Sequence, residues 1–237
     1  IGIGYCAPID WGYLETGTLT LGNNMTLKAG HEAADTKMTP EEYYQGGYRY
    51  ANIYEDILVK GENWFINGDG VLYITGEVQN TSTTTDYTPW KDYKSQIIAV
   101  VAKDGAKVTN CDRLFSNCAN LKSVDIAKLN ITGTTKMRYM FSGCYSIENL
   151  DLSTLDTSAV TNMQCMFYND VELKSVNLDG FKTENVTDMQ FMFRNCSALT
   201  ALDLSDFNTA KGTTMNTMFS GCKNLEKLDI SGFSREK

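Results

Sequence analysis

Apolar positions recur at a fixed interval of 26 residues through the second half of the chain. Residues at equivalent positions of successive repeats form a row, and three apolar rows define the register. These rows are Phe115, Phe141, Phe167, Phe193 and Phe219; Met137, Met163, Met189 and Met215; and Leu121, Ile147, Leu173, Leu199 and Leu225. A fixed period of about 20 to 50 residues indicates a solenoid, in which each repeat buries its apolar face against its neighbours.

The first part of each repeat has helical spacing. In residues 163–185, Met163, Met166 and Phe167 fall at positions i, i+3 and i+4, and Asn162 precedes them as a candidate cap. This pattern predicts a short helix whose apolar face is buried. We interpret the methionine and phenylalanine rows as core rather than as a ligand channel.

The second part of each repeat has the alternation of a strand. After a turn at 168–170, Val176 and Leu178 alternate with polar neighbours, which is typical of a short strand with one buried face. The sequence therefore predicts an α/β fold. Its main element is a leucine-rich-repeat-like solenoid of parallel strands and short helices, preceded by a small β-rich N-terminal module or cap.

The repeat resembles the leucine-rich repeats of BspA-like bacterial surface proteins, in their 26-residue variety. Residues 189–209 carry the resemblance most clearly, and 137–157, 163–183 and 215–233 repeat it. The flank at 63–101 is also similar to a segment that such proteins carry. The resemblance implies a cell-surface or secreted bacterial protein that binds host matrix or neighbouring cells and is not an enzyme.

The first half of the chain carries no repeat. Residues 18–27 alternate around Gly22-Asn23-Asn24, which predicts a hairpin, and Pro40 is suited to open a short helix. Asn67-Gly68-Asp69-Gly70 is the strongest hairpin signal, with Trp64 and Tyr73 on its arms. We predict a β-rich module or extension at 1–60, a β cap at 61–110 and five repeats at 111–237.

Charge and hydropathy narrow the classes of partner. The formal net charge of −8 argues against nucleic acid and against an anionic membrane face. No apolar run approaches the ~18 residues that span a bilayer, so we expect no membrane insertion. The chain opens at Ile1 without a leader, and we interpret it as a mature or trimmed form whose targeting signal is gone.

The cysteines follow the repeat. Four of them share one row with Asp170: Cys118, Cys144, Cys196 and Cys222. Cys165 aligns with Tyr139, Phe191 and Thr217 in another row. Because these rows accept unrelated residue types, we interpret them as packing positions that hold buried free thiols. A bridge between neighbours such as Cys118 and Cys144 is the alternative.

One polar row is a candidate binding site. It lies on the outward side of the predicted strands and contains Asp125, Asp151, Asn177, Asp203 and Asp229. Carboxylates ~4.8 Å apart repel by roughly 0.8 kcal/mol per pair even in water. The row is therefore either a shallow strip for calcium or a basic ligand, or a set of structural residues that bond to their own loops.

Tyrosines in the first module form a second candidate for partner binding. These are Tyr43, Tyr44, Tyr48 and Tyr50, together with Tyr54, and Gly46-Gly47 interrupts them. Exposed tyrosine beside glycine is typical of adaptable recognition loops. The alternative is that the rings form the core of that module. The strand face itself lacks the Trp, Tyr and Arg that dominate binding energy.

Nothing in the chain indicates catalysis or a bound cofactor. The single histidine, His31, has no nucleophile motif around it, and no phosphate-binding loop or zinc motif is present. We therefore expect no enzyme, no cofactor and no catalytic or metal-binding residue. The leading hypothesis is adhesion to a host extracellular-matrix or cell-surface protein. The alternatives are a structural spacer that presents another domain, and a carbohydrate-active enzyme with its site in the N-terminal module.

Overall fold

The computed structural model describes residues 17–21, 25–29, 57–211 and 213–234. The chain divides into two compact units, Ile1–Ile57 and Leu58–Lys237. In the first unit, strands β1 (Gly17–Leu21) and β2 (Met25–Ala29) form an antiparallel hairpin, as the alternation at 18–27 predicted. The helix predicted from Pro40 lies outside the described residues.

The second unit begins with a mixed sheet that caps the solenoid. Its strand order is β3-β4-β5-β7-β9. The bounds are β3 Ile57–Gly61, β4 Trp64–Asn67, β5 Val71–Ile74, β7 Ala99–Ala102 and β9 Ser123–Asp125. Strands β4 and β5 are antiparallel and joined by the predicted turn, in which the Gly70 N–H donates to the Asn67 carbonyl at 2.9 Å.

From β5 onward the sheet is parallel, because each later strand is entered after a full circuit of the chain. Strand β5 pairs with β7, and β7 pairs with β9. A second parallel pair joins β6 (Glu77–Val78) to β8 (Lys107–Val108). The 3-10 helix η2 (Lys91–Gln96) is the one helical element among the described residues, so the predicted solenoid is confirmed with almost no helix.

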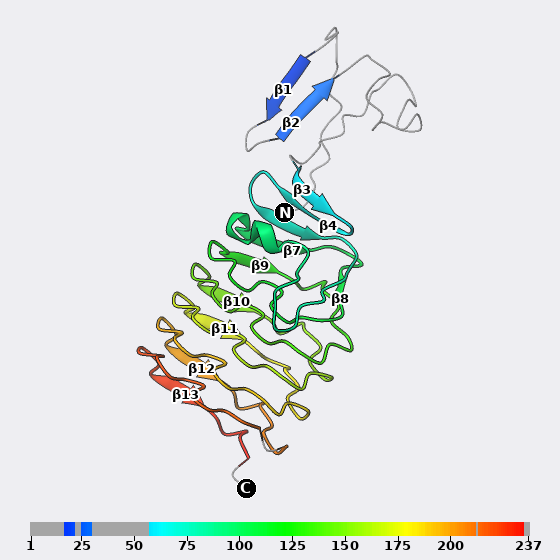
Figure 1. Ribbon diagram of the computed structural model, residues 1–237. Coiled ribbons are helices and arrows are strands. Elements are labelled where there is room, and N and C mark those ends of the chain that lie inside the picture. Colours follow the sequence, from blue (N-terminus) through cyan, green and yellow to red (C-terminus); the bar gives the residue numbers. More distant parts are fainter. Residues whose placement is uncertain (1–16, 22–24, 30–56, 212, 235–237) are drawn as a thin grey trace. The chain divides into compact units, whose positions relative to one another are not determined.

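The 26-residue repeats form stacked coils, each with one short strand. After β9 these strands are β10 (Asn149–Asp151), β11 (Ser175–Asn177), β12 (Ala201–Asp203) and β13 (Lys227–Asp229). Figure 1 shows them side by side in chain order. Where strands pair, residues one repeat apart are opposite each other, as in Leu150 opposite Val176. Equivalent side chains therefore form continuous rows.

The methionine–phenylalanine segment of each coil is not the predicted helix. In the third coil, alternate N–H groups donate to the next coil: Met163 to the Asp188 carbonyl, Cys165 to Gln190 and Phe167 to Met192, at 2.8–2.9 Å. Between them, the Met166 N–H donates three positions back to the Met163 carbonyl, and the Gln164 N–H donates to Asn162 Oδ1 at 2.9 Å. Each segment is thus a run of tight turns, and neighbouring segments are joined by a ladder of backbone hydrogen bonds.

We call this layer the turn ribbon, comprising residues 111–118, 137–144, 163–170, 189–196 and 215–222. Its backbone cannot be helical because two positions per coil have positive φ, as at Cys165 (56°) and Asn169 (65°). The spacing i, i+3, i+4 misled the prediction because consecutive turns also bring those side chains to one face. The apolar face itself is as predicted: Met163, Met166 and Phe167 are fully buried.

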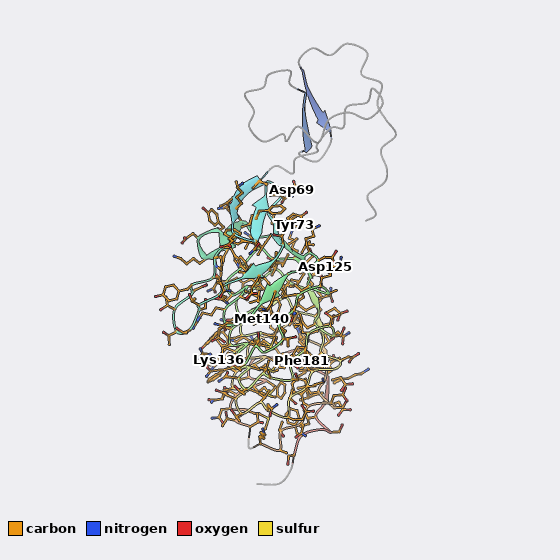
Figure 2. All side chains as sticks on the ribbon, turned by 90° about the vertical axis from the view of Figure 1, so that its right-hand side faces the viewer. Asp69, Tyr73, Asp125, Lys136, Met140 and Phe181 are labelled. Atoms are coloured by element: carbon orange, nitrogen blue, oxygen red, sulfur yellow. The ribbon has the colours of Figure 1, made fainter. Side chains whose placement is uncertain are left out.

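An aromatic stack runs through the core of the second unit. Ring centroids are 5.9 Å apart for Phe141 and Phe167 and 5.1 Å apart for Phe167 and Phe193. The stack continues into the cap, where Trp90 lies 6.1 Å from Phe115 and 5.8 Å from Trp64. Figure 2 shows Met140 and Phe181, from successive coils, within the same densely filled interior. The coils therefore share one continuous core.

One positive-φ row uses residue types that suit it. The row is Asn117, Gly143, Asn169, Asn195 and Gly221, with φ between 59° and 84°. Asparagine and glycine tolerate the left-handed region best. A Cβ at Gly143 would meet the Asn117 side-chain oxygen at 2.7 Å, whereas Asn195 donates to the Asn169 side-chain oxygen at 2.7 Å.

Candidate functional site

The aspartate row lies at the ends of the solenoid strands. Its members close strands β9 to β13, and the four carboxylates are exposed: Asp125, Asp151, Asp203 and Asp229. Asn177 is half-buried in the same row. The parallel register places Asp151 opposite Asn177 and Asp203 opposite Asp229. The structure thus brings together the outward row that the sequence predicted.

Each carboxylate accepts hydrogen bonds from its own loop. Asp151 Oδ1 accepts from the Ser153 N–H at 3.1 Å and from the Ser153 hydroxyl at 2.7 Å. Asp203 and Asp229 accept the backbone N–H two residues later, at 2.9 and 2.8 Å. The serine hydroxyls and N–H groups lower the pKa of Asp151 and Asp203, so these carboxylates remain ionised. These bonds offset the repulsion between neighbours.

The described part of the second unit contains no assembled set of calcium ligands at the aspartate row. Among the described residues, no group of three or more His, Cys, Asp or Glu side chains could hold a metal ion. The row offers one carboxylate per coil, and calcium takes about six to eight oxygen ligands. Calcium binding at the aspartate row therefore stays a prediction.

The tyrosine candidates cannot be placed. Tyr43, Tyr44, Tyr48 and Tyr50 lie outside the described residues, as does Tyr54. The hypothesis that they bind a partner therefore stays a prediction. The candidate surfaces that can be described belong to the second unit.

The turn ribbon contains a second row of residues with positive φ. From the sequence, we interpreted this row as a set of packing positions in the core. The row is Arg113, Tyr139, Cys165, Phe191 and Thr217, with φ between 53° and 59°. Only Cys165 is buried; Arg113, Tyr139 and Phe191 are half-buried and Thr217 is exposed. Large side chains thus lie at the surface on a backbone that disfavours them.

Arginines lie against the rings of this row. The Arg113 guanidinium carbon is 4.2 Å from the Tyr139 ring centroid, and that of Arg194 is 5.5 Å from the Phe191 ring centroid. Both distances are within the range of cation–π attraction. Burial is the main cause that raises the pKa of Tyr139, and its contact with Cys165 adds to the effect. The phenol therefore stays neutral at physiological pH.

A third arginine on the turn ribbon is neutralised. Arg138 forms an ion pair with the buried Asp112, whose Oδ2 accepts from Arg138 Nη2 at 2.6 Å and from Nε at 3.0 Å. The hydrogen bond to Asp112 is the main cause that raises the pKa of Arg138. This pair joins the first and second coils. The sequence signal for the whole surface was available, because three of the chain's five arginines fall within the turn ribbon.

The cysteine row occupies the last position of the turn-ribbon segments. Cys118, Cys144 and Cys196 are fully buried, Cys222 is half-buried, and all are free thiols, as preferred from the sequence. Each of the last three donates to a phenylalanine carbonyl of the preceding coil, as Cys144 donates to Phe115 at 3.2 Å. Burial raises the pKa of these thiols, to about 12 for Cys118.

Two overlapping matches to one family model cover residues 90–177 and 169–237, more than half of the chain. The family is described as "Mycoplasma protein of unknown function, DUF285". The chain belongs to the DUF285 family. The DUF285 segment starts at Trp90, immediately before η2, and contains all five coils, the aspartate row and the turn ribbon. None of the curated proteins compared matches this DUF285 chain.

Two solved structures are similar to this DUF285 chain. A leucine-rich repeat protein from Bacteroides ovatus is 14% identical, with a TM-score of 0.38, over 76% of this chain and 53% of its own. A leucine-rich repeat protein from Eubacterium ventriosum is 14% identical, with a TM-score of 0.23, over 70% of this chain and 82% of its own. The chain thus spans about half the length of the first. The resemblance to bacterial leucine-rich repeat proteins stated from the sequence is confirmed.

Proposed function

We propose that this chain is the binding module of a bacterial cell-surface or secreted protein, and that it adheres to a host matrix protein or to a protein on a neighbouring cell. One observation carries the proposal: the coils stack in register, so each exposed position becomes a row that runs along the array. Extended surfaces of this kind are what repeat proteins use to bind macromolecules.

The protonation state of the exposed carboxylates favours a binding function over catalysis. A general acid needs a pKa near the working pH, whereas hydrogen bonds lower the pKa of Asp151 and Asp203. Asp170 has the opposite shift, since burial raises its pKa well above the usual value, but it is fully buried and out of reach of a substrate. We therefore propose a non-enzymatic role.

The buried thiols are compatible with an oxidising location outside the cell. Thiolates are the reactive form of cysteine, and burial raises the pKa of Cys118, Cys144 and Cys196. These thiols would therefore resist oxidation without forming disulfides. Within the described part of the chain, no helix is long and apolar enough to cross a membrane.

A structural spacer is the second candidate function. The observation in its favour is the aromatic stack, which passes from Trp64 in the cap to Phe219 in the fifth coil. A continuous core of this kind would keep the array straight and stiff enough to hold another domain away from the cell.

Biolayer interferometry on immobilised matrix proteins and surface glycans, with and without calcium, tests the adhesion proposal. The full chain and residues 58–237 would be compared. Binding kept by residues 58–237 would place the partner on the second unit, and calcium dependence would then implicate the aspartate row. Loss of binding on truncation would implicate the first unit and its tyrosines. No binding by either would contradict adhesion and favour the spacer.

A further inference from the structure

We propose that the turn ribbon binds an acidic segment of a partner polypeptide through an arginine–aromatic strip, defined as Arg113, Tyr139, Phe191 and Arg194. This inference rests on the proposed binding function and names both its surface and the chemistry of its partner. The strip extends over the first four coils, roughly 14 Å at ~4.8 Å per coil.

The first argument is charge. The chain is acidic overall, with a formal net charge of −8, yet its turn ribbon concentrates arginine. Arg138 is offset by Asp112, but the described ion pairs leave Arg113 and Arg194 without a carboxylate. Arg194 Nε is buried and has no hydrogen-bond partner among the described residues. A partner's carboxylate, bound at the remaining N–H groups, would supply the counter-charge that both guanidinium groups lack.

The second argument is the geometry of the arginines. A guanidinium group stacked on a ring keeps its N–H edge free for a carboxylate, with which it pairs bidentately. Arg113 stacks on Tyr139 and Arg194 lies over Phe191, so each is held by a ring of the same surface. Stacking reduces the conformational freedom that the arginine would lose on binding.

The third argument compares the two positive-φ rows of the turn ribbon. One row uses asparagine and glycine, which tolerate this conformation, whereas the other uses Arg113, Tyr139, Cys165, Phe191 and Thr217. For such side chains the left-handed conformation costs about 1–2 kcal/mol per residue. Large, half-exposed side chains are thus present where asparagine or glycine would fit the backbone better. Strained residues of this kind cluster at functional sites.

Asp188 is the carboxylate with the strongest claim to neutralise the strip, but it forms none of the described ion pairs. Asp188 influences Arg138 and Cys165 electrostatically, but its oxygens accept bonds from the Gln190 N–H at 3.0 Å and the Asn162 amide at 3.2 Å. Arg113 donates instead to the Thr83 carbonyl at 3.3 Å, which is a neutral acceptor. The strip therefore has positive charge to offer a partner.

The test uses the full chain and a fluorescein-labelled peptide of about ten glutamates, which at ~3.3 Å per residue is long enough to span the strip. Fluorescence anisotropy would measure its dissociation constant at low and at raised salt. A glutamine peptide of the same length controls for backbone binding. The variant Arg113→Gln/Arg194→Gln removes the two free arginines.

The matched control, Lys122→Gln/Lys227→Gln, removes the same charge from exposed positions on the strand side. We expect the arginine variant to bind the glutamate peptide at least about tenfold more weakly and the lysine variant to stay within about twofold, where tenfold is about 1.4 kcal/mol. Raised salt should weaken binding by the unsubstituted chain. Equal losses in the two variants, or no binding by the unsubstituted chain, would overturn the strip.

Binding to the immobilised matrix proteins and surface glycans tests the proposed function separately from the arginine–aromatic strip. If the unsubstituted chain binds the panel and Arg113→Gln/Arg194→Gln binds it equally well, the proposed function stands and the strip is wrong. If panel binding and glutamate binding are lost together in that variant, both are supported.

Discussion

Asp170 Oδ1 accepts a hydrogen bond of 2.9 Å from the backbone N–H of Cys144, the residue that holds the equivalent position one coil earlier. Asp170 is the one carboxylate in the cysteine row, and its other oxygen, Oδ2, is buried without a described partner. Burial raises the pKa of Asp170 well above its usual value. In the next coil, the equivalent thiol of Cys196 donates to the Phe167 carbonyl at 3.1 Å. A neutral Asp170 would donate to Phe141 in the same way.

The first prediction concerns pH. The pKa of Asp170 is higher in the folded chain than the ~3.9 of an unfolded aspartate, so its contribution to stability is full below pH ~4. That contribution is lost as the pH rises toward the folded-state pKa. Asp170→Asn removes this titration. As the pH rises, the free energy of unfolding of the variant should therefore increase relative to that of the unsubstituted chain, by up to about 1.4 kcal/mol per pH unit. Urea unfolding between acidic and neutral pH measures this difference.

Asp170→Cys is the control for that experiment, since it restores the residue type of the row. Its thiol should also remain neutral and donate to the Phe141 carbonyl. The free energy of unfolding of Asp170→Cys should therefore rise with pH, relative to the unsubstituted chain, as much as that of Asp170→Asn. A constant difference between each variant and the unsubstituted chain across the pH range would show that Asp170 does not titrate in this window.

The second prediction concerns the aromatic stack. Phe167 is fully buried between Phe141 and Phe193, so Phe167→Ala should reduce the free energy of unfolding by about 3–5 kcal/mol. Phe219→Ala is the matched comparison, because Phe219 is half-buried in the fifth coil and its loss should cost less than about 2 kcal/mol. Chemical denaturation followed by circular dichroism measures both. Equal costs would contradict the burial gradient.

The third prediction concerns the backbone of the turn ribbon. Gly143 has φ of 78°, so Gly143→Ala should destabilise the chain by about 1–2 kcal/mol through backbone strain. Gly143→Asn should cost less, because asparagine tolerates positive φ and can pair with Asn117 as Asn195 pairs with Asn169. Thermal melting ranks the two variants. If alanine were tolerated better than asparagine, side-chain crowding rather than φ would govern this row.

The fourth prediction concerns thiol reactivity. Cys118, Cys144 and Cys196 are fully buried and their pKa values are raised by burial, so native protein should leave them unlabelled by iodoacetamide. Cys222 is half-buried and should react first among the cysteine row. Mass spectrometry after native and denatured alkylation, without reductant, measures the order. Blocked pairs in the denatured sample would reveal disulfides.

The repeat register was accessible from the sequence because burial is periodic. Rows such as the phenylalanines are buried by stacking, so their spacing predicted the coils and the outward row that contains Asp151 and Asp203. The antiparallel β4–β5 hairpin followed from local turn chemistry at Asn67–Gly70. In both cases the residue types at a position determine its structure directly.

The turn ribbon was not accessible in the same way. Spacing of i, i+3 and i+4 fits a helix and a run of turns equally, and the hydrogen bonds that decide between them, such as Phe167 to Met192, lie between coils. The exposure of Tyr139 and Phe191 was missed for a related reason. A row that mixes Tyr, Cys, Phe and Thr suggested packing, whereas the positive φ of these positions is visible only in the structure.

The aromatic stack also places two fluorescent tryptophans at one end of the array of coils. Trp64 and Trp90, two of the chain's three tryptophans, lie 5.8 Å apart beside the first coil, and Trp90 is fully buried. Their emission therefore reports the junction of cap and first coil, whereas the far-ultraviolet signal reports every coil. Coincident denaturation curves would describe a single cooperative unit, and separated curves would describe an array that opens one coil at a time.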